Sequence, residues 1–285
     1  MVRLVTWQRP RCWMTTRTKA HRSESSRSDV ILYASVPFDT AFTRLEEIIA
    51  RRVHPELYFS SSILDECRDA DVKCLGRALS HAGISYTFHA PYIDLVPGGL
   101  DRKMREATKE RLEHVVHLAS LITPQSIVCH PGYDDWRYGE FQDVWLQGSA
   151  EMWGGLGKRA RKAGVTLLLE NVFENAPATL ERLLASLDPA CFGFCFDVGH
   201  WLVYSTAGVD EWMDRLGNRL REIHLHDNHG HGDEHLPPGD GGMFDFRSFF
   251  QLLGDRRHHV RFTLEIRDER KLERSYVQVR RYLEP

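Results

Sequence analysis

The sequence predicts an α/β fold, a single (β/α)8 TIM barrel, on three observations. From residue 30 onward, short β-rich runs alternate with helical segments eight times. The fifth run, V-T-L-L-L-E-N, is almost entirely apolar or β-branched, which is typical of a parallel strand covered on both faces. The length of 285 residues, with 42% hydrophobic content, suits one large barrel with a full core.

Each expected strand is a short run rich in β-branched, aromatic or leucine residues and bounded by loops. The seventh run ends in I-H-L-H, where apolar and polar residues alternate, and it leads into a loop rich in Gly and Pro. We expect strands at residues 30–36, 55–60, 84–89, 126–130, 165–171, 191–197, 220–226 and 261–266.

The expected helices show helical periodicity and recognisable ends. Asp101 is placed to cap the third helix, and Gly83 and Gly164 follow the second and fourth helices, where glycine commonly ends a helix. We expect helices at residues 40–52, 74–82, 101–122, a segment that ends at 163, and then 178–186, 209–216, 246–253 and 271–283.

Residues 1–28 differ from the rest of the chain. They are rich in Arg, Ser and Thr, contain few acids and lack the apolar segment of a secretory signal. We expect a disordered tail here, with the barrel domain occupying residues 29–285.

Composition excludes some classes of partner. The net charge of -3, from 37 basic and 40 acidic residues, gives no overall field that would attract nucleic acid. No apolar run is long enough to cross a bilayer, so we expect no membrane contact. The six cysteines lack C-x-x-C spacing, and we interpret them as reduced thiols of a cytoplasmic protein.

Acids and imidazoles end the expected strands from the third to the eighth. In such a barrel the carboxyl ends of the strands converge on one face, where active sites lie. Carboxylates that meet there must be neutralised, and a divalent metal does so directly. These six residues are His89, His130, Glu170, Asp197, His224 and Glu265.

Three more residues have the spacing of metal ligands. His200 follows Asp197 across a short turn, and Asp233 and His235 are two residues apart in an extended segment, so their side chains project to the same side. Imidazole and carboxylate ligands suit Zn, Mn or Fe. The alternative is a solvated, histidine-rich loop without a metal.

Seven short motifs, in chain order, resemble the xylose-isomerase-like TIM barrels. This family includes endonuclease IV (AP endonuclease family 2) and many sugar and sugar-phosphate isomerases and epimerases. The resemblance covers the chain from about residue 30 to its end. The motifs are F-H-A-P-Y, C-H-P-G, L-L-E-N, F-D-V-G-H, I-H-L-H-D, D-E-H-L-P-P-G-D-G and L-E-I.

The resemblance to endonuclease IV implies up to three zinc ions. The first would be held by His89, His130 and Glu170, the second by Glu170, Asp197, His224 and Glu265, and the third by His200, Asp233 and His235. Isomerase branches of the family keep one metal, at the second of these sites, and lack the D-x-H pair. The sequence departs from endonuclease IV in its first strand, which reads L-Y-A-S-V-P in place of G-A-H-V-S.

Two enzymatic hypotheses follow. The filled third site favours metal-dependent hydrolysis of a phosphodiester in a small nucleotide-like substrate, with a corrinoid nucleotide loop or abasic DNA as further candidates and duplex DNA disfavoured by the charge. The alternative is a sugar or sugar-phosphate isomerase or epimerase, in which Glu170 and Glu265 flank one metal and move a proton. A non-catalytic metal-holding barrel is a remote third.

We expect three further residues to contact the substrate, namely Tyr92, Asn171 and His226. With Ile93, Tyr92 forms an aromatic and apolar pair that either inserts into a nucleic acid or packs at the rim.

Overall fold

The described chain forms one closed parallel barrel, which confirms the predicted fold. The computed structural model describes residues 30–284, so the tail expected at 1–28 lies outside the described residues. The strands are β1 (Leu32–Pro37), β2 (His54–Tyr58), β3 (Thr87–His89), β4 (Ile127–Cys129), β5 (Leu167–Glu170), β6 (Phe192–Asp197), β7 (Leu220–Leu225) and β8 (Arg261–Leu264). Their order around the barrel follows the chain, and parallel pairing of β1 with β8 closes it.

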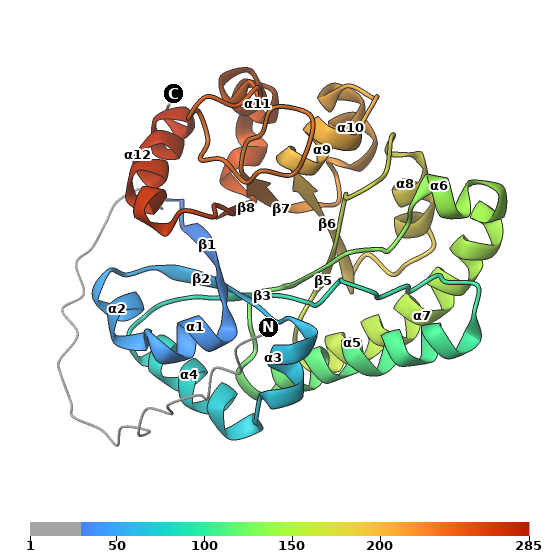
Figure 1. The fold of residues 1–285 in the computed structure, drawn as a ribbon, viewed down its shortest axis with the longest axis horizontal. Helices are drawn as coiled ribbons and strands as arrows, with labels where there is room; N and C mark the ends of the chain where they lie inside the picture. The colour runs from blue at the N-terminus through green and yellow to red at the C-terminus, as the bar shows by residue number, and fades with distance from the viewer. Residues whose placement is uncertain (1–29, 285) are drawn as a thin grey trace, which may run out of the picture.

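Helices surround the strands (Figure 1). The α-helices are α1 (Phe38–Thr43), α2 (Leu45–Ala50), α3 (Ser61–Glu66), α4 (Asp69–His81), α5 (Arg102–Ile122), α6 (Asp135–Tyr138), α7 (Gln142–Lys162), α8 (Ala178–Ala185), α9 (Val198–Tyr204), α10 (Val209–Leu216), α11 (Phe246–Leu253) and α12 (Leu272–Leu283). The short 3-10 turns are η1 (Gly139–Phe141), η2 (Gly254–His258) and η3 (Glu269–Lys271). None of the described helices is long and apolar enough to cross a membrane.

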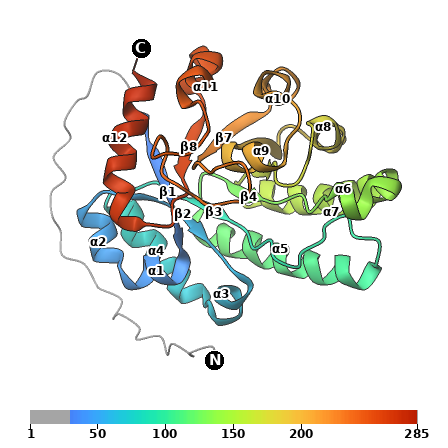
Figure 2. The same cartoon turned by 45° about the horizontal axis from the view of Figure 1, so that its top comes forward.

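Helix α9 is the main departure from the predicted elements, because a short turn was expected after Asp197. The β-branched Val198 and the following Gly199 are poor helix formers, which hid this helix in the sequence. The side chain of Asp197 accepts a hydrogen bond from the backbone N–H of His200 and so caps the helix. Helix α9 lies against β7 near the carboxyl end of that strand (Figure 2).

Other differences are local. The first expected helix is divided at Arg44 into α1 and α2, and α3 was not predicted. Ser60 caps α3 by accepting from the backbone N–H of Ile63. Asp101 caps α5 as expected, by accepting from the backbone N–H groups of Lys103 and Met104. The helix before it, α4, starts at Asp69, five residues earlier than the predicted Cys74.

Alternate residues of each strand point into the barrel, and they form layers. A polar layer lies deep in the barrel, where Glu222 accepts hydrogen bonds from Ser126 and Thr263. His224 lies two residues after Glu222 on β7, at the next position that points into the barrel. The interior of this barrel therefore carries buried charge below the strand ends, and the strand ends themselves carry the candidate site.

Candidate metal centre

The carboxyl ends of the strands surround a cavity of about 220 Å³. His89, His130, Glu170 and Glu265 line it. Asp197 and His224 are fully buried next to these groups. The six strand-end residues therefore come together at one face, although their roles as ligands stay predictions.

Glu170, the last residue of β5, contacts imidazoles on both of its oxygens. Its Oε2 lies 3.2 Å from Nε2 of His89 and 3.2 Å from Nε2 of His130. Its Oε1 lies 3.2 Å from Nδ1 of His200 on α9. This buried carboxylate belongs to two compact groups of possible ligands, one with His89 and His130 and one with Asp197 and His224.

A second set of side chains surrounds Nδ1 of His224 on β7. This nitrogen lies 3.4 Å from Oε1 of Glu170, 3.6 Å from Oδ2 of Asp197 and 3.4 Å from Oε1 of Glu265. Ligand atoms bound to one zinc ion at about 2.0–2.2 Å are separated by roughly 3–4 Å. Glu170, Asp197 and His224 form a compact group whose ligand atoms all lie within 4.8 Å of one another, and Glu265 lies beside it at ligand distance from His224.

These side chains fit a divalent cation. Nδ1 of His224 and Oε1 of Glu170 are buried, and neither has a hydrogen-bond partner among the described residues. Buried polar atoms normally have a partner, and three clustered carboxylates need positive charge near them. Oxygen and imidazole ligands suit Zn, Mn or Fe, so the chemistry of the set indicates a metal but leaves its identity open.

The predicted third set is only partly assembled. Asp233 Oδ2 lies 2.7 Å from Nε2 of His235 but 3.8 Å from Nε2 of His200, whose Nδ1 faces Glu170. His226, not His200, shares a compact group with Asp233 and His235, in which all ligand atoms lie within 4.8 Å of one another. The rings of His226 and His235 stack with centroids 4.1 Å apart and planes 6° apart.

Electrostatics in this cluster favours protonated His89 and His200 next to ionised carboxylates, whereas burial lowers the pKa of His130. Burial opposes the charge on His89, but its hydrogen bond to Glu170 and the Glu170 charge outweigh it and raise the pKa of His89 to about 9. Burial opposes the charge on His200 as well, and Asp197 and Glu170 together raise its pKa to about 10. Burial would likewise raise the pKa of Glu170, yet the histidines around it hold that pKa well below its usual value.

The three residues expected to contact the substrate occupy different positions. Tyr92 lines the cavity, is 38% exposed and stacks on His130 with ring centroids 4.2 Å apart. The Asn171 amide donates to the backbone carbonyl of Asp197 and accepts from its backbone N–H, so Asn171 joins β5 to β6 and positions Asp197. His226 is fully buried, with Nε2 2.9 Å from Oδ2 of Asp197. Asn171 and His226 therefore contact Asp197, and Tyr92 lies at the cavity wall, while contact with a substrate stays a prediction for all three.

Besides Glu222 in the polar layer, two buried glutamates escaped the sequence analysis. Glu56 on β2 is fully buried, and its Oε1 lies 3.3 Å from Nε2 of His224. Burial raises the pKa of Glu56 to about 7. Glu174, in the loop after β5, accepts the backbone N–H of Val172, and burial raises its pKa to about 7. A charged residue within an apolar strand was the available signal for Glu56, in H-P-E-L-Y.

Aromatic side chains form much of the cavity wall. Tyr58, Phe173 and Tyr204 join Tyr92 there. The rings of Tyr58 and Tyr92 are 6.1 Å apart, and those of Phe173 and Tyr204 meet edge to face at 4.9 Å. Such faces suit a ligand with an apolar side.

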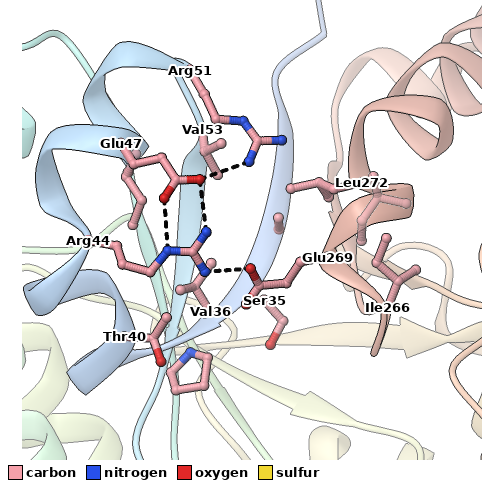
Figure 3. Close-up of a pocket in the computed structure, with 14 residues that line it drawn as sticks. Ser35, Val36, Thr40, Arg44, Glu47, Arg51, Val53, Ile266, Glu269 and Leu272 are labelled. Carbon is pink, nitrogen blue, oxygen red and sulfur yellow. Dashed lines mark hydrogen bonds and ion pairs between the residues drawn. The ribbon is translucent and has the colours of Figure 1, made fainter.

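A second, smaller cavity of about 60 Å³ lies outside the barrel, between α2 and the segment that joins β8 to α12 (Figure 3). Arg44 forms ion pairs with Glu47 and Glu269 across it. Its walls are otherwise largely aliphatic, and the pairs are partly exposed to solvent. This cavity lacks the acids and imidazoles of the strand ends, so the candidate site is the larger one.

Comparison with known proteins agrees with the barrel fold. Residues 55–285 match the model of a family described as xylose isomerase-like TIM barrel. A protein from Thermus thermophilus, solved after soaking with ZnCl2, superimposes with a TM-score of 0.77 at 27% identity, over 89% of this chain and 98% of that one. A D-tagatose 3-epimerase-like protein gives 0.76 at 21% identity, over 88% and 97% of the two chains. At that identity the second likeness shows the fold alone.

Curated relatives cover less of the chain. An uncharacterised protein of Methanocaldococcus jannaschii is 25% identical over 224 residues, 75% of each chain. Fructoselysine 3-epimerase of Escherichia coli is 28% identical over 129 residues, which are 40% of this chain and 46% of that protein. No hydrolase is among the relatives described here, whereas epimerases recur.

Proposed function

We propose, because this chain belongs to the xylose isomerase-like TIM barrel family, that it is an isomerase or epimerase of a small sugar and uses one divalent metal ion. The observation that carries the proposal is the arrangement of Glu170 and Glu265 around Nδ1 of His224, at 3.4 Å each. Two carboxylates beside one candidate ion are what proton exchange at a carbon next to a carbonyl requires.

The two glutamates would divide the proton transfer between them. One carboxylate removes a proton from the carbon next to the carbonyl, and the other returns a proton to the opposite face of that carbon, which inverts it. Glu170 is 1% exposed and Glu265 is 11% exposed, so both act in a site largely shielded from water. A bound divalent ion would supply polarisation of the carbonyl oxygen.

The wall of the cavity supports a sugar without phosphate. Among the described residues that line it there is no lysine or arginine, whereas anion sites for phosphate normally provide one. The aromatic rings of Tyr58, Tyr92 and Phe173 suit the apolar face of a sugar, and His235 and Asp233 offer polar groups for its hydroxyls. This favours a free sugar over the sugar phosphate that the sequence analysis also allowed.

The sequence-based preference for phosphodiester hydrolysis now has weaker support than its alternative. One observation still favours it, namely that Asp233 and His235 lie 2.7 Å apart near the candidate ion. The functional names among the similar proteins are those of epimerases and xylose isomerases. Hydrolysis therefore remains the second candidate.

Proton exchange with solvent is the direct test. The purified protein, loaded with Mn²⁺ or Zn²⁺, is incubated in D2O with a panel of free ketoses, and NMR follows deuterium at the carbon next to the carbonyl together with the epimeric product. We expect both for at least one sugar. Glu170→Gln and Glu265→Gln should each reduce turnover by a factor of about 10²–10⁴, because each removes an acid–base group but keeps its volume.

The same preparations are assayed against bis(p-nitrophenyl) phosphate. Cleavage of this diester without deuterium exchange in any ketose would reverse the order of the two candidates. Full turnover of either glutamate variant would contradict the proposed roles.

A further inference from the structure

Glu56 occupies the inward face of β2, one layer below the candidate metal ligands. Its side chain is fully buried. Oε2 accepts a hydrogen bond from Thr87 Oγ1 at 3.2 Å, and Oε1 lies 3.3 Å from Nε2 of His224. The carboxylate is therefore held between the neighbouring strand β3 and the far side of the His224 ring.

The two nitrogens of His224 face different surroundings. Nδ1 faces the carboxylates of Glu170, Asp197 and Glu265, which make up the candidate ion site. Among the described carboxylates, the one within ion-pair distance of Nε2 is Glu56, and the buried Cys195 thiol also lies beside the ring. An imidazole that binds a cation through Nδ1 must carry its proton on Nε2, and the partner of that N–H fixes the tautomer and the orientation of the ring.

Burial makes this contact matter. Oε1 of Glu56 and Nε2 of His224 have no well-aligned hydrogen-bond partner elsewhere among the described residues. The 3.3 Å contact is itself poorly aligned as a hydrogen bond, and the proposal requires the ring to turn so that Nε2–H points at Oε1. A buried N–H without an acceptor is unfavourable, and Glu56 is the acceptor within reach.

We propose that Glu56 is a positioning residue of the metal centre: it accepts the Nε2–H of His224 and so holds the tautomer whose Nδ1 binds the cation. This goes beyond the proposed function, because it concerns the binding of the ion and is independent of the substrate. The proposal also explains why the barrel interior contains the fully buried Glu56 carboxyl group.

A competing arrangement makes Glu56 a ligand itself. Glu56, His89, His224 and Glu265 each offer an atom within 4.8 Å of the others. However, Nδ1 of His89 is hydrogen-bonded to the backbone carbonyl of Ala90, and its Nε2 faces Glu170. The His89 ring is therefore engaged on both sides, which favours the positioning role over a separate ion at this place.

The test measures the affinity and number of bound ions in the full-length protein. Zn²⁺ is titrated in competition with a chromogenic chelator for the wild type and for Glu56→Ala, Glu56→Gln and Thr87→Val. Glu174→Gln is the matched control, since it neutralises an equally buried glutamate that does not contact His224. Nitrogen NMR of protein with labelled histidine reports the tautomer in the zinc-bound state.

We expect Glu56→Ala to weaken zinc binding about 10–100-fold with unchanged stoichiometry, the usual effect of losing the partner of a metal-binding histidine. Glu56→Gln keeps an acceptor oxygen and should recover part of that loss, and Thr87→Val should cause a smaller one. Glu174→Gln should bind zinc as the wild type does. The histidine that binds through Nδ1 should show its proton on Nε2 in the wild type.

Three results would overturn the proposal. They are equal affinity in the wild type and all Glu56 variants, loss of a whole zinc equivalent in Glu56→Gln, and failure of the wild type to bind any divalent ion. Thermal melts of each variant show whether it is folded. If Glu56→Ala does not fold, Glu56→Gln and Thr87→Val decide the outcome alone. Because no sugar is present, failure of the proposed sugar chemistry would leave this result unaffected.

Discussion

At the scale of single residues, the site is a balance between protons and a cation. In the absence of an ion, His89 and His200 neutralise the carboxylates by holding protons, with pKa values of about 9 and about 10. A metal must displace the proton of any imidazole nitrogen that binds it, because a protonated nitrogen has no lone pair, and its charge disfavours protons on the neighbouring histidines. The same histidines therefore carry protons in the metal-free protein and are neutral ligands or neighbours of the ion in the metal-bound protein.

This balance predicts how stability and metal binding change with pH. A histidine with a pKa of about 9 in the folded state, against about 6.5 when unfolded, contributes stability that is complete below about pH 6.5 and is lost as the pH rises through 9. The metal-free protein should thus lose this stability between pH 6.5 and 9, while affinity for Zn²⁺ rises over the same interval. Calorimetry at pH 7 in two buffers of different ionisation heat should show release of about one proton or more per ion. Heats that do not depend on the buffer would contradict it.

The sequence predicted correctly which side chains meet at the site where those residues lie at the ends of strands. His89, Glu170 and Asp197 end strands, and parallel strands bring their ends together whatever the details of packing. Glu56 lies in the middle of a strand, where an acid reads as a solvated residue unless the inward positions are already known. The pairing of His226 with Asp233 depends on the path of a long loop, which no local pattern specifies.

At the scale of elements, the join between β6 and α9 organises the site. Asp197 ends the strand, caps the helix and faces His224, so one residue links three parts of the fold. The loop after β7 is held against α9, since the Asn228 amide donates to the carbonyl of Gly199. A change at this join should therefore be felt by the candidate ligands.

Gly199 gives a sharp test of this join. A Cβ at this position would lie 2.0 Å from Cε1 of the buried His226 ring, so Gly199→Ala must displace that ring or the helix. We expect it to lower the free energy of unfolding by roughly 1–3 kcal/mol and to weaken zinc binding, because His226 contacts Asp197. Chemical denaturation and zinc titration measure the two effects.

The matched control is Gly155→Ala in α7, where an added Cβ has no atom within 4 Å. Alanine is the better helix former, so this change should stabilise the protein by up to about 1 kcal/mol. Similar effects of the two substitutions would show that the β6–α9 join has no special part in the site.

At the scale of the whole molecule, fold and chemistry were not equally predictable. Strand–helix alternation fixed the barrel, and the family match confirms it. The choice between hydrolysis and epimerisation depends on how many ions bind at the carboxyl ends of the strands. The same strand-end residues could take part in either reaction. Asp233 and His235 decided the sequence-based preference, yet their spacing in the sequence does not reveal whether three ligands converge in space.

The number of bound ions is therefore the most informative property of the molecule. The His226 and His235 rings are nearly parallel, so their in-plane lone pairs lie in stacked planes and do not converge on one point. Around Nδ1 of His224, by contrast, three carboxylate oxygens lie at 3.4–3.6 Å. We expect elemental analysis to find one tightly bound divalent ion per chain. Replacement of both Asp233 and His235 by alanine should leave that ion in place.

The same ion should stabilise the whole barrel, since its candidate ligands come from β5, β6, β7 and the end of β8. An ion present at a thousand times its dissociation constant adds about 4 kcal/mol, which for a protein of this size corresponds to a rise in Tm of roughly 7–8 °C. Scanning calorimetry with EDTA and with added Zn²⁺ measures the difference, and the double alanine variant should keep it. Near three equivalents of metal in the wild type, with one lost in that variant, would instead establish a separate ion at Asp233 and His235 and would restore phosphodiester hydrolysis as the leading candidate.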